Sequence, residues 1–375
     1  MQQMKNVFGI INFHNGPSCS PMTDNRPLGS TSFLGRYAFC DFALSSLCNS
    51  GISQVGLLIR DYPRSILKHL GTMDSWVANT KLGFTRIMYN ERAHLGHMPN
   101  TDVNNLLEND TVLYDSSAQY LVFFPAHIVL PIDLRPVIER HIKNGDQITV
   151  VTSQQRNVAT HWMDSTIITK DAKGLLSSER NHGQFKGTQT VSLGVYIINR
   201  TTLLDLIHRY AIDHPGLALR DLIFTAHREG VHRCAFYSYD GFVRNPDSFL
   251  HYFEDSLEML DKKNFEQLFR RDWPIYTLTH DTPPAIYGKE AIVHNSFISN
   301  GSSIEGDVED SIIARNVVIE KDAVVRNSII FSSVRIKQGA VIENALVDKY
   351  SIVERGHVVR GKKKAPLYVP QGAIL

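Results

Sequence analysis

The C-terminal part of the chain repeats isoleucine or valine at intervals of six residues. A period of six matches neither the turn of a helix nor the two-residue alternation of an extended strand. It is typical of a parallel β-helix, in which each hexapeptide forms one short strand and points one apolar side chain inward. A sandwich of ordinary strands is the alternative. The repeating residues are Ile286, Ile292, Ile298 and Ile304, then Ile312, Val318, Val324, Ile330, Ile336 and Ile342 in a second frame, and Val341, Val347, Val353 and Val359 in a third.

The first 270 residues alternate strand-like and helix-like segments. This alternation predicts an α/β domain with a mostly parallel sheet that helices cover on both faces. The polar segment Asn90–Asp110 is expected to form a mobile flap over a pocket. We expect one domain over residues 1–270, a linker over 271–285 and the β-helix over 286–375. The expected strands are Val7–Ile11, Gln54–Ile59, Tyr120–Phe124, Gln147–Thr152 and Ser192–Ile198, and the expected helices are Phe39–Asn49, Pro63–Leu70, Leu134–Lys143, Thr202–Ala211 and Phe249–Leu260.

Charge and cysteine content restrict the class of protein. The 375 residues carry a formal net charge of +1, which gives no reason to expect nucleic acid or an anionic membrane as partner. The four cysteines show no metal-ligand spacing and suit a reducing compartment. No apolar run reaches the length of a membrane helix or a secretory signal. We therefore expect a soluble protein of the cytoplasm.

Three stretches resemble a known enzyme family. They are YAFCDFALSSLCNSGI at Tyr37–Ile52, VSLGVYII at Val191–Ile198, and DWPIYT at Asp272–Thr277 with the following Pro283–Ala285. Together they resemble the ADP-glucose pyrophosphorylases, the glucose-1-phosphate adenylyltransferases of glycogen and starch synthesis. The resemblance spans nearly the whole chain. It implies a Rossmann-like nucleotidyltransferase domain followed by a left-handed β-helix.

The chain departs from this family where the family binds phosphate. The family motif G-G-x-G-T-R corresponds here to the run Phe13–Ser18, in which only Gly16 remains, as a turn glycine. Glycines in such a loop let backbone amides approach phosphates, and the arginine neutralises their charge. A further lysine and arginine of the family are also replaced. The degenerate positions on this side are Phe13, His14, Gly16, Ser18, Leu28 and Ala38.

The metal-binding positions of the family are depleted as well. Nucleotidyl transfer needs a divalent cation, which the family holds with two aspartates. Ala126 and Asn245 stand at the corresponding positions, so one ligand is lost and the other is neutral. Asp247 is a poor substitute two residues away. We therefore assign no catalytic residue and no metal or cofactor to this chain.

The resemblance is nearest to the non-catalytic, D-type subunits of the family. It implies a regulatory subunit that joins a catalytic subunit in a heterotetramer, with Mg²⁺ only at the catalytic partner; a homodimer of the chain alone is also compatible. One alternative is a divergent but active nucleotidyltransferase that uses Asp102, His127, Arg244 and Asp247. Another is an acyltransferase, for which the β-helix offers only His294 and His357.

Basic residues suggest a site for an anionic effector. In the family, such metabolites bind where the two domains meet. We expect Arg26, Arg36, Lys362 and Lys363 to form a pocket for a phosphorylated sugar or a nucleotide monophosphate. A solvated surface is the alternative for each of these residues.

Overall fold

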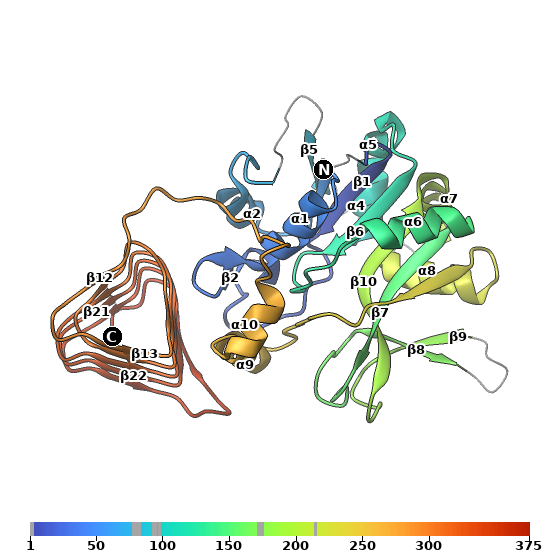
Figure 1. Cartoon of the computed structure of the whole chain (residues 1–375). Coiled ribbons are helices and arrows are strands. Elements are labelled where there is room, and N and C mark those ends of the chain that lie inside the picture. Colours follow the sequence, from blue (N-terminus) through green and yellow to red (C-terminus); the bar gives the residue numbers. More distant parts are fainter. Residues whose placement is uncertain (1–3, 77–83, 92–95, 97–98, 171–175, 214–215) are drawn as a thin grey trace.

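The chain forms an α/β domain and a triangular β-helix, joined by a long connection (Figure 1). This computed structural model describes residues 4–76, 84–91, 96, 99–170, 176–213 and 216–375. No helix within these ranges is long and apolar enough to cross a membrane.

A nine-stranded sheet forms the centre of the first domain, with the main order β11-β7-β10-β6-β1-β4-β5. Most neighbours in this order are parallel, but β10 runs antiparallel to β6 and β7, and β8 pairs antiparallel with β10 and β9. Among the described residues no helix separates the consecutive strands β7 to β10, and strands joined without a crossover helix pair antiparallel. The strands are β1 (Val7–Asn12), β4 (Gln54–Ile59), β5 (Phe84–Tyr89), β6 (Tyr120–Pro125), β7 (Ile148–Gln155), β8 (Thr166–Lys170), β9 (Leu176–Arg180), β10 (Gln189–Asn199) and β11 (Cys234–Ser238).

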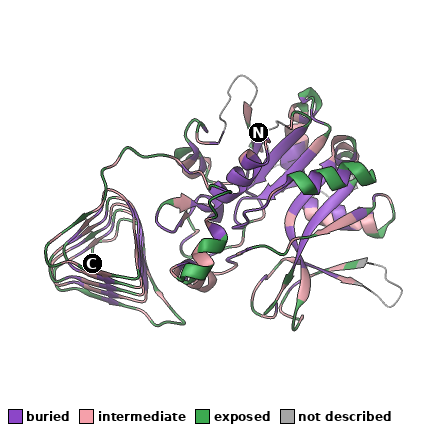
Figure 2. Cartoon of the chain, in the orientation of Figure 1, coloured by how far each residue is buried: buried purple, intermediate pink, exposed green. Residues whose placement is uncertain are grey.

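Helices cover both faces of this sheet, as the sequence predicts. Strand β1 is buried throughout and alternates its side chains, so that Val7 and Ile11 face one core while Phe8 and Ile10 face the other. The first core includes α1 (Phe39–Asn49), α2 (Pro63–Leu70) and α6 (Arg135–Asn144). The second includes α4 (Asp102–Glu108), α5 (Asp110–Asp115), α7 (Arg200–Asp213) and α8 (Leu219–Arg228). Figure 2 shows the central strands buried between these layers.

The segment Asn90–Asp110 is not the polar flap that we expected. Residues 92–95 and 97–98 of this segment lie outside the described part of the chain. Asp102–Glu108 forms helix α4, whose Val103 and Leu106 are buried in the second core. The Thr101 side chain accepts a hydrogen bond from the Asn104 amide and caps the helix. The polar composition of this segment gave no sign of helix α4, which contributes to the core and carries the buried carboxylate of Asp102.

Three five-stranded parallel sheets form the sides of the β-helix, the arrangement of a left-handed β-helix (Figure 1). The first sheet contains β12 (Ile286–Tyr287), β15 (Ser303–Ile304), β18 (Val318–Ile319), β21 (Arg335–Ile336) and β24 (Ile352–Val353). The second contains β13 (Ile292–His294), β16 (Asp307–Glu309), β19 (Val324–Arg326), β22 (Val341–Glu343) and β25 (Val358–Arg360). The third contains β14 (Phe297–Ile298), β17 (Ile312–Ile313), β20 (Ile329–Ile330), β23 (Ala345–Val347) and β26 (Leu367–Val369).

The interior row differs from the expected sixfold frame at several positions. Paired residues Ile313, Ile330 and Val347 follow one another at 17-residue intervals, so one side of each of these coils is a residue shorter than six. The short side ends at a corner where Asp310, Asn327 and Asn344 adopt positive φ. Asparagine and aspartate tolerate this conformation better than most residues. Ile313, not Ile312, therefore faces the β-helix interior, as do Ile319 and Val325 in place of Val318 and Val324. Ile286 and Ile292 of the first coil are exposed.

The residues displaced from the interior serve the contact between the domains. Ile312, Ile329 and Leu346 of the third sheet are buried together with Phe39 of α1 and Tyr252 of α9. The hairpin β2 (Ser32–Phe33) and β3 (Tyr37–Ala38), the short 3-10 helix Leu28–Ser30, and helices α9 (Phe249–Glu258) and α10 (Lys262–Leu268) complete this side of the α/β domain.

The connection to the β-helix lies along helix α1. The Asn49 Nδ2 donates to the Pro274 carbonyl at 2.8 Å, and the Tyr276 amide donates to the Ser45 hydroxyl at 2.8 Å. The segment that resembles the family motif DWPIYT is thus fixed to the helix that carries the other family-like stretch.

Candidate functional site

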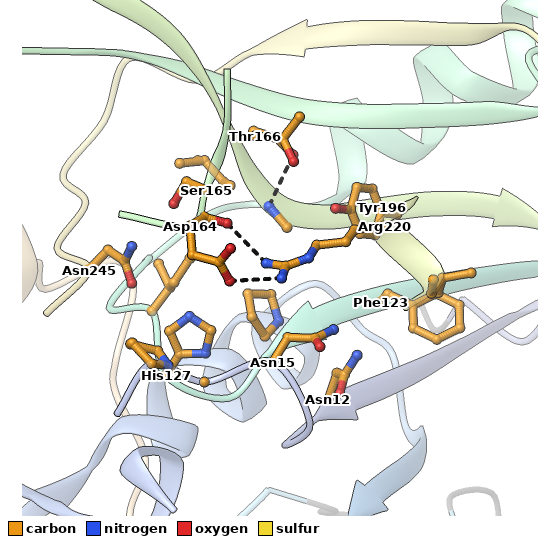
Figure 3. A pocket seen from close by; sticks show the side chains of 18 of the residues that line it. Asn12, Asn15, Phe123, His127, Asp164, Ser165, Thr166, Tyr196, Arg220 and Asn245 are labelled. Carbon is orange, nitrogen blue, oxygen red and sulfur yellow. Dashed lines mark hydrogen bonds and ion pairs between the residues drawn. The ribbon is translucent and has the colours of Figure 1, made fainter. Parts of the chain in front are cut away.

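A pocket lies beyond the carboxyl ends of β1 and β6 (Figure 3). In α/β sheets this edge is where ligands bind. The cavity measures about 110 Å³, well below the roughly 300–1,000 Å³ of small-molecule sites. It is lined mainly by Asn12, Asn15, Gly16, Pro17, Asp102, Phe123, His127, Asp164, Thr166, Tyr196, Arg220 and Asn245.

The loop after β1 is filled by its own side chains. Phe13 is buried in the first core, where the family has a glycine. The Asn105 Nδ2 donates to His14 Nε2 at 2.9 Å, and burial lowers the pKa of His14 to about 4, with Arg60 adding to this and Asp102 opposing it. A Cβ on Gly16 would meet His127 at an ordinary 3.6 Å, so the position does not require glycine. The loop therefore presents no glycine cradle for phosphate.

The other positions on the phosphate side are also apolar or small. Ser18 and Leu28 line a second cavity of about 160 Å³ next to the loop, and Leu28 is buried. Ala38 is buried at the start of α1, where its amide donates to the Asp41 carboxylate at 2.9 Å. None of these three side chains carries a positive charge, so none can neutralise a phosphate.

The Asp102 carboxylate links several elements around the pocket. Its carboxylate accepts hydrogen bonds from Asn12 Nδ2 at 2.9 Å, Asn15 Nδ2 at 2.7 Å and the Leu219 amide at 2.9 Å. It also accepts from the amide of Val103 and is 1% exposed. This carboxylate joins β1, its loop, α4 and the N-terminus of α8, so it is committed to structure. The position was expected as a catalytic group only under the alternative of an active enzyme.

The residues at the metal positions do not fit Mg²⁺. Ala126 is buried and offers no ligand atom. Asn245 contributes one neutral oxygen, which has no hydrogen-bond partner among the described residues. His127 lies beside them, and burial, with Arg220 second, lowers its pKa to about 3. Mg²⁺ prefers anionic oxygen ligands in near-octahedral geometry, which one amide and one imidazole do not provide.

An ion pair at the pocket was not anticipated from the sequence. Arg220, near the N-terminus of α8, donates from Nη2 to the Asp164 carboxylate at 2.8 Å and from Nη1 to the Asp164 carbonyl at 3.0 Å (Figure 3). The same carboxylate pairs with Arg180 of β9. Burial opposes ionisation of Asp164, but the contacts with Arg220 and Arg180 outweigh it and lower the carboxyl pKa. The partners are 56 residues apart and belong to no spacing motif.

The remaining groups of the two alternatives are dispersed. Asp247 accepts from the Met163 amide at 2.8 Å and pairs with His251, and its side chain is 2% exposed. Arg244 pairs with Asp255 and Glu258 of α9. Neither Asp247 nor Arg244 lines the described pocket. The candidate acyltransferase bases are also far apart along the β-helix, because His294 lies in the first coil and His357 precedes the last strand of the same sheet.

The four residues expected to bind an effector do not form one pocket in the structure. Arg26 is 3% exposed and pairs with Asp348, whereas Arg36 lines a groove beside the first coil. Lys362 and Lys363 are exposed on a turn after β25. The stack of coils, with strands about 4.8 Å apart, separates Arg36 from the lysines.

Two other basic residues lie closer to Arg26. Lys68 Nζ donates to the Tyr350 hydroxyl at 3.5 Å, and Lys349 precedes that tyrosine. Burial, followed by the charges of Arg26 and Lys68, lowers the pKa of Lys349 to about 8. A helix of the first domain and a late coil of the β-helix thus bring three cations together.

Comparison with known proteins agrees with this architecture. Residues 283–365 match the family model described as GlmU-like, C-terminal hexapeptide. The chain is 31% identical over 311 residues to the glycogen biosynthesis protein GlgD of Geobacillus stearothermophilus, which covers 81% of this chain and 78% of the relative. It is 28% identical over 304 residues to GlgD of Bacillus subtilis, with the same coverage. The glucose-1-phosphate adenylyltransferase of Bacillus cereus is 23% identical over 369 residues, or 96% of each chain.

The relative that is 31% identical also shares most of its length with the chain, and the glucose-1-phosphate adenylyltransferases match over nearly the whole chain at lower identity. The chain belongs to the GlgD family of glycogen biosynthesis proteins, and its role lies in that pathway.

Proposed function

We propose that the chain is a non-catalytic regulatory subunit of glucose-1-phosphate adenylyltransferase. It assembles with a homologous catalytic subunit and raises the rate at which that partner makes ADP-glucose and pyrophosphate from ATP and glucose 1-phosphate. The observation that carries the proposal is that Asn245 lines the pocket of about 110 Å³ and Ala126 lines the adjoining cavity of about 160 Å³, at the two positions where the family has aspartates.

The number of lost groups supports the absence of catalysis. Removing one preorganised charge-stabilising group costs about 10²–10³ in rate. Losses within one site are not additive, because the remaining groups act as a unit. Here the loop, its arginine and the anionic metal ligands are all missing, and Asp102 is committed to four internal hydrogen bonds. No charged group is left in the pocket that is not already paired within the described chain.

The first coil of the β-helix supports assembly. Ile286 and Ile292 are each 64% exposed, and Tyr287 is 52% exposed. The strands of this coil, β12, β13 and β14, begin their sheets and pair on one side only within the described chain. Exposed apolar side chains on open strand edges are typical of an interface. This surface suits a heterotetramer with the catalytic subunit, or a homodimer when the chain is alone.

The three cations at the domain boundary support a site for an anionic effector. Arg26, Lys68 and Lys349 converge there, with Asp348 paired to Arg26. A phosphorylated metabolite or a nucleotide would relieve their mutual repulsion. Binding that favours one arrangement of the domains changes the partner's activity by a coupling of about 1–3 kcal/mol.

The remaining proposals concern conditions in the cell. The four cysteines are free, which supports a reducing compartment such as the cytoplasm. The misfit of Ala126 and Asn245 supports a chain that needs no Mg²⁺ of its own, so that Mg²⁺ acts at the catalytic partner.

The test is a pyrophosphate-release assay with ATP, glucose 1-phosphate and Mg²⁺. The chain alone is expected to give no turnover, and its mixture with a catalytic homologue more turnover than the homologue alone. Robust turnover by the pure chain would overturn the proposal. An Ile286→Asp variant should lose the stimulation, while Ile374→Asp, at an equally exposed position on the opposite end, should keep it.

A further inference from the structure

A cysteine, an aspartate and a histidine meet where helix α1 begins and helix α2 ends. Cys40 Sγ, an Asp41 carboxylate oxygen and a ring nitrogen of His69 all lie within 4.8 Å of one another. Cys40 and Asp41 belong to the first turn of α1, whereas His69 belongs to the last turn of α2, 28 residues after Asp41. Thiolate, carboxylate and imidazole are the side-chain groups that bind Zn²⁺ in proteins. Because the third group comes from another helix, no sequence spacing indicated the cluster.

The three atoms lie close to the positions that one metal ion requires. His69 Nε2 is 2.6 Å from Asp41 Oδ1, and Cys40 Sγ is 3.9 Å from the same oxygen. Bonds of about 2.0–2.3 Å in tetrahedral geometry place the ligand atoms about 3.3–3.8 Å apart. The thiol is therefore already placed, and the imidazole has to withdraw from the carboxylate by about 1 Å.

The carboxylate of this cluster is buried without a fixed cationic partner. Asp41 and Cys40 are both 0% exposed, and Asp41 Oδ2 is held by the Ala38 amide at 2.9 Å. Among the described residues no lysine or arginine pairs with Asp41, because Arg315, on which its charge acts, donates to backbone carbonyls instead. Buried charges in proteins are paired or coordinate a metal. A thiolate and a carboxylate would together balance the two positive charges of Zn²⁺.

Access and ligand chemistry favour Zn²⁺ over the harder divalent ions. The side chain of His69 is 16% exposed, so an ion can enter beside the imidazole while the other two ligands stay buried. Mg²⁺ and Ca²⁺ select oxygen ligands, whereas a thiolate selects softer metals such as Zn²⁺. Three protein ligands leave the fourth position of the tetrahedron to water. None of the three residues lines the pocket of about 110 Å³ or the cavity next to it, so the cluster is separate from the candidate functional site.

We propose that Cys40, Asp41 and His69 form a binding site for Zn²⁺ that joins the start of α1 to the end of α2. The site goes beyond the proposed function and does not depend on it. Helix α1 also holds the connection to the β-helix, through Ser45 and Asn49. An ion that binds only the folded chain stabilises it, and here it stabilises the helix along which the connection lies.

The experiment is a titration of the metal-free full chain with Co²⁺, a spectroscopic substitute for Zn²⁺, under reducing conditions. Tetrahedral Co²⁺ bound to a thiolate gives intense visible bands and a sulfur-to-metal charge-transfer band in the near ultraviolet. We expect both to saturate at about one equivalent of Co²⁺. Zn²⁺ should abolish them and Mg²⁺ should not, because only Zn²⁺ competes for the thiolate. Zn²⁺ should also raise the thermal unfolding midpoint of the wild-type chain.

Two variants and a matched control locate the site. Cys40→Ser should abolish the charge-transfer band and weaken the Kd for Co²⁺ by at least about 100-fold, because losing a residue that only orients a ligand already costs about 10–100-fold. His69→Gln keeps a donor for Asp41 but removes the imidazole, so Zn²⁺ should no longer raise its unfolding midpoint. The control is Cys48→Ser, which removes a half-buried thiol from the same helix and should retain the wild-type bands and Kd.

Each outcome decides for or against the site. Bands that are present in the wild type and Cys48→Ser but absent in Cys40→Ser, with the Zn²⁺ stabilisation lost in His69→Gln, support it. A wild type without a charge-transfer band overturns it, as does a band that survives in Cys40→Ser. Equal binding of Co²⁺ by all four proteins means an adventitious ion only and also overturns it. The regulatory role is read separately, from pyrophosphate release, so it stands or falls whatever the cobalt spectra show.

Discussion

The pocket and the contact between the two domains both involve the α/β domain, but the pocket is lined largely by polar side chains and the contact is formed by apolar ones. At the pocket, polar groups are tied to one another, as in the Asp164–Arg220 pair and the four hydrogen bonds of Asp102. At the domain contact, Phe39 and Tyr252 pack with ring centroids 5.9 Å apart, against Ile329 of the β-helix. The first region differs from the family motifs, whereas the second has a close-packed apolar core.

Two of the three family-like stretches lie apart from the divergent stretches of the sequence. The family-like stretches Tyr37–Ile52 and Asp272–Thr277 meet along helix α1, at the side of the domain that faces the β-helix. The stretches that differ from the family lie at the pocket, where they meet the third family-like stretch, Val191–Ile198, whose Ser192 and Tyr196 line the cavity. A chain that serves assembly needs the first set and can dispense with the second.

The largest expected effect tests the domain contact. Phe39 is 1% exposed, and Phe39→Ala should lower the free energy of unfolding by about 3–5 kcal/mol, because it leaves a cavity between the domains. Thermal and urea unfolding measure this change. Ile142→Ala, at a position that is 42% exposed, is the control and should change stability by no more than about 0.5 kcal/mol. Similar values for the two variants would show that the contact is loosely packed.

A second variant tests whether the pocket is structural. Asp102→Ala should cost about 2–4 kcal/mol, because it leaves the Asn12, Asn15 and Leu219 donors buried without an acceptor. Urea unfolding is the measurement, with Asp110→Ala at the more exposed start of α5 as control. Replacing a carboxylate that serves catalysis rather than folding often costs little stability and can even raise it. An unchanged stability in Asp102→Ala would therefore favour the alternative of an active enzyme.

The pocket should also contribute a pH dependence of its own, through His127. Burial lowers the pKa of His127 to about 3, so the folded chain keeps it neutral while the unfolded chain protonates it below about pH 6.5. Its contribution to stability is lost as the pH falls from 6.5 towards 3, and amounts to about 2 kcal/mol between pH 7 and 5. His127→Gln should reduce the pH dependence of unfolding over this interval by that amount. His294→Gln, on the exposed first coil, should reproduce the wild-type curve.

The smallest expected effect concerns the lysine turn after β25. Lys362→Ala and Lys363→Ala should each change stability by less than about 0.5 kcal/mol, because both side chains are exposed. Lys364→Ala is the variant for comparison, because Lys364 donates to Glu254 of α9 at 2.9 Å and so links the turn to the first domain. The second measurement is the change in turnover of the mixed complex when effector is added. If Lys362→Ala and Lys363→Ala leave this response unchanged while Lys349→Gln abolishes it, the cations beside Arg26 are the effector site.

Local signals made much of the fold predictable. Helices α1 and α2 and strand β4 have the bounds read from the sequence, because each combines a clear apolar pattern with a definite start, such as Pro63 at the first turn of α2. The period of six predicted the β-helix, but the five-residue side that shifts Ile312 out of the interior depends on corner geometry. The apolar character of Ile312 and Ile313 is the same, so the sequence could not tell which one faces inward.

The sequence predicted the region of the candidate site but not its contacts. Ala126 and Asn245 line or adjoin the pocket region as the family alignment implied, because motif positions follow the ends of strands. The contacts that replace the lost chemistry join residues far apart in the chain: Asp164 with Arg220, Asn12 with Asp102, and Arg26 with Asp348. Neither period nor spacing encodes such pairs, and charge alone gave no reason to choose one partner over another.

The third side of the β-helix has two adjacent apolar residues on each strand, one for its own interior and one for the α/β domain. A β-helix expressed without the α/β domain would therefore expose an apolar surface formed by Ile312, Ile329 and Leu346. We expect it to precipitate or to require a solubilising fusion. The boundary between the domains is clear on the sequence, yet the two halves are not separable parts. Recombination that exchanged this β-helix for that of a distant relative would have to exchange its docking face as well.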